Sequence, residues 1–361
     1  MSGQTTNLAA VVHGPNDLRM EEIAVPVPGE GGKTGVHKCC CRSGRWGSAG
    51  SDIKYWRDGR CGRFRLTSPM VIGHEASGTV VGVGPGVLHL KLGDRVAIEP
   101  GVPCRKCQYC KSGRYNLCPD IVFCATPPGD GNMCRYYIHP ADFCFRLPDC
   151  VSLDEGALLE PLAVAIHSCR KGDVTSGDSV LVCGAGPIGI LTMLVARRLG
   201  AEKIVITDVD IQRLEFAASL GASTLLVQSQ TQIELCTGIT DLLQGRPRSV
   251  FECSGVDTNL HLAIDVVAPG GVVVMVGRGS SDLKLPVFQI TSKEVQIKGV
   301  FRYSNCYRAA LNMVLSMPDT NIKQLITHRF PLEGAIKAFE MASGRNNGAI
   351  KVVVQCDAIT D

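Results

Sequence analysis

The chain lacks any run of eighteen or more apolar residues, so no segment is long enough to cross a bilayer as a helix. Its first residues lack the basic start, apolar centre and small-residue cleavage site of a signal peptide, which favours a cytoplasmic protein. Blocks of like charge are absent and the net charge is only +3, so we expect no nucleic-acid or membrane partner. Aromatic residues are scarce, at 5% of the chain. With 40 glycines, this composition favours an α/β enzyme with many tight turns.

Cysteine is the residue type that the chain has in excess, with 18 in 361 residues. A disulfide framework is typical of small exported domains, and this chain is large and shows no export signal. Most of the cysteines stand alone in apolar segments such as "VLVCGAG" and "FECSGV". A solitary cysteine of that kind behaves as a small core hydrophobe, so we expect no chemistry from most of them.

The pattern of apolar segments predicts two domains of the α/β class. From residue 178 to about 299, short apolar strands alternate with amphipathic helices, which predicts βαβ units and a doubly wound parallel sheet of the Rossmann type. Residues 1–150 are richer in glycine and proline and contain short alternating strands such as "SGTVVGV". They therefore predict a mostly β domain.

A glycine-rich turn, "GAGPIG", follows a predicted strand and opens a predicted helix. Gly184, Gly186 and Gly189 have the spacing that permits a tight turn, close approach of a pyrophosphate and close helix–sheet packing. Asp208 ends the next strand, where a carboxylate binds the adenosine ribose and repels a 2′-phosphate, so NAD is predicted over NADP. The alternative is that Asp208 only caps the helix beginning near Val209. Arg213 is close enough to reach a phosphate, which weakens the exclusion of NADP.

Four cysteines, Cys104, Cys107, Cys110 and Cys118, follow the spacing C-x2-C-x2-C-x7-C. Four thiolates on one short lobe make a closed tetrahedral zinc site, which is structural because no coordination position stays open. An iron–sulfur cluster is the alternative, and the chain shows no second electron-transfer site to accompany it.

The segment "GHEASGTVVGVG" places His74 and Glu75 in the pattern G-H-E-x2-G-x5-G. A lone pair of this kind is commonly a salt bridge or a cap, but this glycine pattern resembles the zinc-dependent medium-chain alcohol dehydrogenases. The segments "GDRVAIEPG", "EGALLEPLAVAIH", "VLVCGAGPIG" and "KGVFRY" extend the resemblance over nearly the whole chain and point to its polyol and ketose-reductase branch.

This resemblance implies a catalytic zinc ion held by a cysteine, a histidine and a glutamate. His74 and Glu75 match the last two, and Glu160 in "LLEP" matches the residue that holds the water beside the zinc ion. Ser51 matches a proton relay. The implied substrate-binding residues are Tyr55, Arg302 and Tyr303. The implied cofactor contacts, besides the three glycines, are Ile188, Asp208, Arg213, Val276, Gly277, Arg278, Val300, Phe301 and Arg302. Arg278 stands where the family often has an apolar residue.

The resemblance also implies the organisation and the reaction. A GroES-like catalytic domain, residues 1–160 and 300–361, would enclose an NAD-binding domain, residues 161–299, with the active site in the cleft between them. The implied reaction is zinc-dependent hydride transfer from a polyol such as sorbitol or xylitol to NAD, giving the ketose, in a homotetramer. The rival functions are an inactive NAD-binding homologue and a secondary-alcohol dehydrogenase of the same fold.

One segment departs from the family. "HKCCCRSGRWGSAGSD", residues 37–52, has Ala49 where the family carries its zinc-ligand cysteine, and no apolar strand is recognisable before it. Cys39, Cys40 and Cys41 could substitute as ligands, the chain could be a natural zinc-site mutant, or residues 31–49 could be read out of frame. Sliding the codons back by one base permits V-L-L-x4-V-G-I-C. We therefore interpret residues 31–49 as a frameshift or a mispredicted exon. We predict that the literal chain lacks this strand and binds NAD but oxidises polyols negligibly, and that Ala49→Cys alone recovers little activity.

Overall fold

The computed structural model describes residues 6–27, 38–316, 322–344 and 347–356. The chain divides into two compact units, one formed by residues 1–160 with 307–361 and the other by residues 161–306. The sequence places the second boundary at 299/300, several residues earlier. Residues 300–306 belong with the inserted unit because Val300 N donates to Met275 O at 3.0 Å and Arg170 Nη1 donates to Asn305 O at 3.2 Å.

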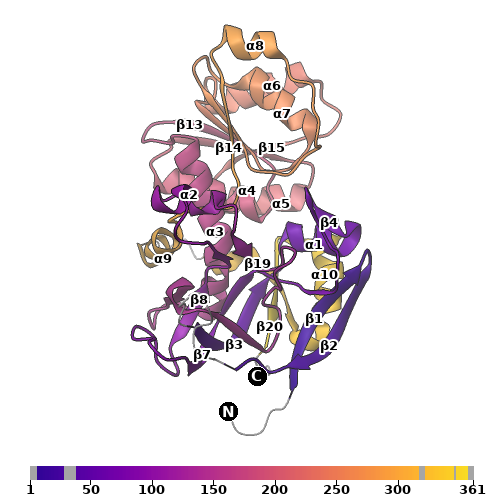
Figure 1. Cartoon of the computed structure of the whole chain (residues 1–361). Coiled ribbons are helices and arrows are strands. Elements are labelled where there is room, and N and C mark those ends of the chain that lie inside the picture. Colours follow the sequence, from indigo (N-terminus) through magenta and orange to yellow (C-terminus); the bar gives the residue numbers. More distant parts are fainter. Residues whose placement is uncertain (1–5, 28–37, 317–321, 345–346, 357–361) are drawn as a thin grey trace. The chain divides into compact units, whose positions relative to one another are not determined.

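The inserted unit is built on a six-stranded parallel sheet in the order β15-β14-β13-β16-β17-β18 (Figure 1). Its strands are β13 (Ser179–Cys183), β14 (Lys203–Asp208), β15 (Ser223–Leu226), β16 (Ser249–Glu252), β17 (Val272–Met275) and β18 (Gln296–Gly299). The helices that connect them are α4 (Pro187–Arg198), α5 (Ile211–Ser219), α6 (Gln232–Leu243), α7 (Asp257–Val266) and α8 (Val287–Ser292). The strand order reverses beside β13, so the doubly wound arrangement predicted from the sequence is confirmed.

The other unit is mostly β, as predicted. Its largest sheet has the order β12-β8-β7-β3-β20-β19, with β11 paired to β3. Its strands are β3 (Lys38–Gly47), β7 (Glu75–Val83), β8 (Arg95–Ile98), β11 (Tyr136–Pro140), β12 (Cys144–Arg146), β19 (Ile326–Pro331) and β20 (Lys351–Gln355). A second sheet, ordered β2-β1-β6, contains β1 (Thr6–Gly14), β2 (Asp17–Ala24) and β6 (Met70–Val71).

Short elements and helices complete this unit. The two-stranded pairs are β4 (Arg60–Cys61) with β5 (Phe64–Arg65), and β9 (Gly101–Val102) with β10 (Val122–Phe123). The helices are α1 (Gly50–Asp58), α2 (Gln108–Lys111), η1 (Tyr115–Leu117), η2 (Ala141–Phe143), α9 (Tyr307–Ser316), η3 (Ile322–Leu325), η4 (Leu332–Gly334) and α10 (Ala335–Ser343). Helix α3 (Leu153–Lys171) begins in this unit and ends in the inserted one. No helix of the described segments is long and apolar enough to cross a membrane.

The prediction that the literal chain lacks a strand before Ala49 is wrong. Residues 38–47 form β3, which pairs with β7, β11 and β20. Cys39 and Cys41 are fully buried and occupy the positions where apolar residues would stand. Trp46 is also fully buried, and its Nε1 donates to Asn132 O at 2.5 Å. The tertiary pairing on both edges thus accommodates a segment that has little apolar periodicity of its own. Residues 31–37 of the suspected segment lie outside the described residues.

Candidate functional site

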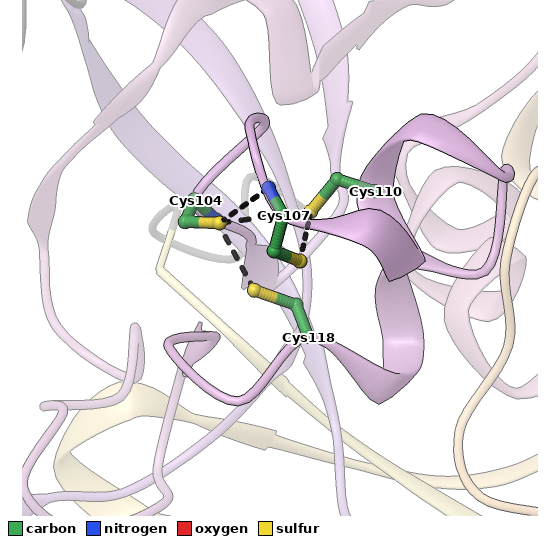
Figure 2. Close-up of side chains that lie close together, drawn as sticks. All are labelled: Cys104, Cys107, Cys110 and Cys118. Atoms are coloured by element: carbon green, nitrogen blue, oxygen red, sulfur yellow. Dashed lines mark hydrogen bonds between the residues drawn. The ribbon is translucent and has the colours of Figure 1, made fainter.

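The four-cysteine lobe predicted to bind zinc brings its thiols together (Figure 2). One ligand atom from each of Cys104, Cys107, Cys110 and Cys118 lies within 4.8 Å of all the others. The Sγ atoms of Cys104 and Cys110 are 3.9 Å apart, and those of Cys107 and Cys110 are 3.4 Å apart. A zinc–sulfur bond of about 2.3 Å sets the sulfurs of a tetrahedron about 3.8 Å apart, so the four thiols fit zinc.

Backbone N–H groups of the lobe stabilise negative charge on its sulfur atoms. The N–H of Cys107 donates to Cys104 Sγ at 3.3 Å, and the N–H of Cys104 donates to Cys118 Sγ at 3.4 Å. Hydrogen bonds from the backbone of Lys106 and Cys107 lower the pKa of Cys104 to about 7. Amide donors that point at the sulfurs favour the thiolate, which is the form that binds a metal.

Cys107→Ser should remove one zinc ion per chain and lower the melting temperature, because the binding energy of a structural metal is also folding energy. Elemental analysis of the purified protein, together with thermal denaturation, measures both effects. Cys150→Ser is the matched control, since Cys150 is exposed and belongs to no cluster of the described residues. An unchanged zinc content in Cys107→Ser would contradict the assignment of the lobe.

A second group of possible ligands forms at the residues predicted to hold the catalytic zinc ion. His74 and Glu75 stand at the start of β7, and Glu160 lies inside α3. All three are buried, and their ligand atoms lie within 4.8 Å of one another. One imidazole nitrogen and two carboxylates form a donor set that suits zinc. The structure therefore brings Glu160 from a distant segment together with His74 and Glu75, the residues that the sequence predicted around the catalytic zinc ion.

His74 is oriented by a residue that the sequence analysis did not single out. Asp52 is fully buried in the first turn of α1, and its Oδ1 lies 3.0 Å from His74 Nδ1. This contact leaves Nε2 of the ring as the ligand atom, and Ser51 Oγ lies 3.4 Å from it. A carboxylate behind a histidine ligand fixes the tautomer and raises the basicity of the ring. The only signal in the sequence was the acid directly after Ser51.

The electrostatics of this group favour a cation. Burial lowers the pKa of His74, but the carboxylates of Asp52, Glu160 and Glu75 outweigh that effect and raise it to about 9. Three buried carboxylates around one imidazole are unfavourable without compensating positive charge. A bound divalent cation would supply positive charge at this place.

Lys351 is a second residue that the sequence analysis missed. It lies on β20, its side chain is only 2% exposed, and its Nζ forms an ion pair with Glu75 Oε2. The same ammonium donates to Ser48 O at 3.0 Å. A lysine inside the apolar strand "IKVVVQ" is a signal in itself, because a lysine is almost never fully buried without a partner.

Ala49 stands beside this group, where the family carries its cysteine ligand. It is the N-cap of α1, is 8% exposed, and accepts a hydrogen bond from Ile53 N at 3.1 Å. The residue before it and the residue two positions after it contact the group: Ser48 shares the Lys351 ammonium with Glu75, and Ser51 contacts His74. Residue 49 thus lies in a segment that contacts the group on both sides of it.

The predicted polyol-binding residues are divided between the two units. Tyr55 lies on α1 in the first unit, and its side chain is only 2% exposed. Arg302 and Tyr303 belong to the inserted unit. Arg302 has a positive φ of 54°, and its guanidinium carbon lies 4.8 Å from the centre of the Phe301 ring. That these residues meet one polyol molecule stays a prediction.

The glycine-rich turn has the geometry that its sequence predicted. Gly184 has a φ of 103°, a left-handed conformation that favours glycine. A side chain at Gly189 would collide with the carbonyl oxygen of Gly184, so only glycine permits the close packing of α4 against the turn that follows β13. Gly186 is the N-cap of α4, and a Cβ there would meet nothing within 4 Å. The free N-terminus of α4 is suited to a pyrophosphate.

Asp208 ends β14 and is joined to this turn, because its Oδ2 accepts a hydrogen bond from Ala185 N at 2.6 Å. The alternative that Asp208 caps the following helix is wrong. Asp210 is the N-cap of α5 and accepts hydrogen bonds from Gln212 N at 2.9 Å and Arg213 N at 3.3 Å. Asp208 therefore remains the acid beside the pyrophosphate turn.

The other predicted cofactor contacts lie at or directly after the carboxyl ends of the parallel strands or in the first turns of α4 and α5, which is the edge where ligands of such sheets bind. They are Ile188, Arg213, Val276, Gly277, Arg278, Val300, Phe301 and Arg302. Arg213 Nε lies 3.8 Å from Asp210 Oδ2, and a side chain at Gly277 would collide with Gly255. Their contact with NAD stays a prediction.

Known proteins match both units. Residues 38–149 match the alcohol dehydrogenase GroES-like domain, and residues 187–316 match the zinc-binding dehydrogenase domain. The sorbitol dehydrogenase of Mus musculus is 48% identical over 97% of this chain and 96% of its own length. The sorbitol dehydrogenase of Homo sapiens is 47% identical over 99% of this chain and 98% of its own length.

Solved structures agree. An oxidoreductase of unknown specificity from Escherichia coli has a TM-score of 0.89 at 33% identity and covers 98% of this chain and 100% of its own. The L-idonate 5-dehydrogenase of Escherichia coli has a TM-score of 0.87 at 28% identity, with 97% of this chain and 98% of its own covered. With its glycine-rich turn, its four-cysteine lobe and its His74–Glu75–Glu160 group, the chain belongs to the zinc-dependent medium-chain alcohol dehydrogenases, in the branch of the sorbitol dehydrogenases.

Proposed function

We propose that this chain is a polyol dehydrogenase, which oxidises a polyol such as sorbitol or xylitol to the ketose with NAD as hydride acceptor and zinc as the catalytic metal, and that Ala49 keeps the rate of the unmodified chain low. The observation that carries the proposal is the convergence of His74, Glu75 and Glu160, with Ser51 Oγ 3.4 Å from the ligand nitrogen of His74. The near full-length likeness to sorbitol dehydrogenases supports the substrate class.

Different residues of the chain would bind the metal ion, accept the proton and bind the substrate hydroxyls. His74, Glu75 and Glu160 would hold the zinc ion, and Asp52 keeps the Nε2 atom of His74 directed at it. A bound zinc ion polarises a substrate hydroxyl and lowers its pKa. Ser51, in the first turn of α1, is placed to accept the hydroxyl proton. Tyr55, Arg302 and Tyr303 would bind the remaining hydroxyls, so that analogues lacking them are rejected.

Asp208→Ala should reduce the preference for NADH over NADPH by roughly tenfold, the effect of about 1.4 kcal/mol. The carboxylate that ends β14 repels a 2′-phosphate, and alanine removes that repulsion. Fluorescence titration gives both dissociation constants without requiring turnover. Asp210→Ala is the control, because it removes the cap of α5 at a cost of about 1 kcal/mol in stability and should leave the preference unchanged. Equal affinities for the two cofactors in the unmodified chain would contradict the prediction.

A substrate comparison tests the proposed reaction itself. NADH formation should be faster with sorbitol and xylitol than with simple secondary alcohols, because several side chains are available to bind hydroxyls. The comparison is made in the Ala49→Cys variant saturated with zinc and NAD, so that the metal site is complete. A preference for simple secondary alcohols would favour a secondary-alcohol dehydrogenase of the same fold.

The quaternary structure and the location of the protein are part of the same proposal. The resemblance to the polyol branch supports a homotetramer acting in the cytoplasm. Light scattering of the purified protein measures the first of these directly.

A further inference from the structure

Three cysteines outside the two zinc groups share one place in the core of the first unit. Cys39 and Cys41 lie on β3, and Cys144 begins β12. Their exposed fractions are 0%, 0% and 4%. Cys39 Sγ lies 3.4 Å from Cys144 Sγ and 3.9 Å from Cys41 Sγ, and all three sulfurs lie within 4.8 Å of one another. Neither the family resemblance nor the proposed reaction uses them.

The sheet brings these sulfurs together and separates them from the third cysteine of the run. Side chains alternate along a strand, so Cys39 and Cys41 share a face while Cys40 points away from it. Cys40 Sγ instead lies 3.9 Å from Pro26 O. Cys144 reaches the same place from the end of β11, which pairs with β3: Pro140 lies opposite Lys38, and Cys144 Sγ lies 3.6 Å from Pro140 O. The three ligands thus stand on strands of one sheet, which holds them rigidly.

We propose that Cys39, Cys41 and Cys144 form a binding site for one monovalent copper ion. The donors are sulfur alone, and soft thiolate ligands select copper(I) among the common metals. Three sulfurs around an ion at about 2.3 Å are about 4.0 Å apart. The 3.9 Å between Cys39 and Cys41 matches this spacing, and the 3.4 Å between Cys39 and Cys144 would lengthen when the ion binds. Among the described residues this group offers only three ligand atoms, and its burial excludes water as a fourth. Zinc prefers four ligands, so three-coordinate copper(I) fits better.

The proton balance of binding is simple. Each cysteine that binds as a thiolate releases its proton to solvent. No electron is transferred, so the ion must enter already reduced.

The experiment counts metal ions in the full chain. The unmodified protein, Cys39→Val/Cys41→Leu, Cys144→Ser and Cys183→Val are each produced in copper-supplemented cells, purified without oxygen and weighed by native mass spectrometry. Valine and leucine suit a buried strand, and Cys144→Ser tests the site from a different strand. Cys183 is a fully buried cysteine of the other unit, so its variant controls for the loss of a core thiol. The four-cysteine lobe is the same in all four proteins, so any copper that it binds does not contribute to the differences between their copper counts.

We expect the unmodified chain and Cys183→Val to carry one more copper ion than Cys39→Val/Cys41→Leu and Cys144→Ser. Copper should also raise the melting temperature of the same two proteins, because an ion that binds only the folded state stabilises that state. Equal copper counts in all four proteins would overturn the proposal. So would a Cys39–Cys144 disulfide in the copper-free protein, seen as the loss of two hydrogens per chain.

Discussion

Replacing Ala49 with cysteine should raise zinc-dependent polyol oxidation by at least about a hundredfold, since even partners behind a ligand change metal affinity or activity by about 10–100-fold. The unmodified chain offers His74, Glu75 and Glu160 without a thiolate. A site that lacks one ligand binds zinc weakly and holds it poorly placed for the reaction. The cysteine should supply the missing sulfur, and a second zinc ion per chain should appear.

The single substitution suffices because the backbone around residue 49 is already built. The sequence alone predicted that this substitution would recover little activity, because no strand was recognised before residue 49. The structure contains that strand as β3, so the reason no longer applies. Gly47 pairs with Glu75 across β3 and β7, and any side chain at Gly47 would collide with the Glu75 carboxylate. The segment therefore enters the site at a fixed register, which an exchange at residue 49 leaves intact.

Polyol-dependent NADH formation and zinc content are measured together for the unmodified chain, Ala49→Cys and Ala49→Ser. Serine is the matched control, because it has nearly the size of cysteine but offers a hydroxyl in place of a thiolate. It should recover little of either property. Full activity in the unmodified chain would mean that another group completes the site. Zinc uptake without activity in Ala49→Cys would place the defect elsewhere.

Lys351→Met should lower the free energy of unfolding of the zinc-free protein by about 3–5 kcal/mol, because it leaves Glu75 as a buried charge without its partner. Lys351 and Glu75 are only 2% and 4% exposed in their side chains. Methionine keeps the apolar length of the lysine stem, so the loss reports the charge rather than a cavity. Zinc should restore much of the loss in the Ala49→Cys background, because a cation returns to the Glu75 carboxylate.

Urea unfolding with and without zinc measures both effects. Lys323→Met is the control, since the Lys323–Glu155 pair is more exposed, with 38% of the lysine side chain accessible. Exposed pairs are worth about 0–1 kcal/mol, so this variant should change little. A loss in Lys351→Met no larger than in Lys323→Met would show that the buried pair contributes no more than a surface one.

The sequence predicted best where the chemistry is local. The four-cysteine lobe and the glycine-rich turn are each contained in a short segment whose spacing alone defines the ligand geometry. It failed at β3, because three cysteines, two arginines and a serine hide the apolar pattern and the strand is imposed by neighbours on both edges. It missed Lys351 because its partner, Glu75, lies at the other end of the chain. Such contacts leave no mark in a local pattern.

β20 is the last strand in chain order among the described residues, and its late position has a consequence for how the nascent chain matures. On the ribosome the inserted unit is contiguous and can fold while the C-terminal residues are still being made. The catalytic unit cannot, because β3 gains its β20 edge only when residues 353–355 emerge. Until then Glu75 has no ammonium beside it, and its segment must stay hydrated or find a metal ion instead. A chain released before residues 353–355 are made would therefore contain a folded inserted unit and a catalytic unit in which β3 lacks its β20 edge and Glu75 lacks its partner ammonium.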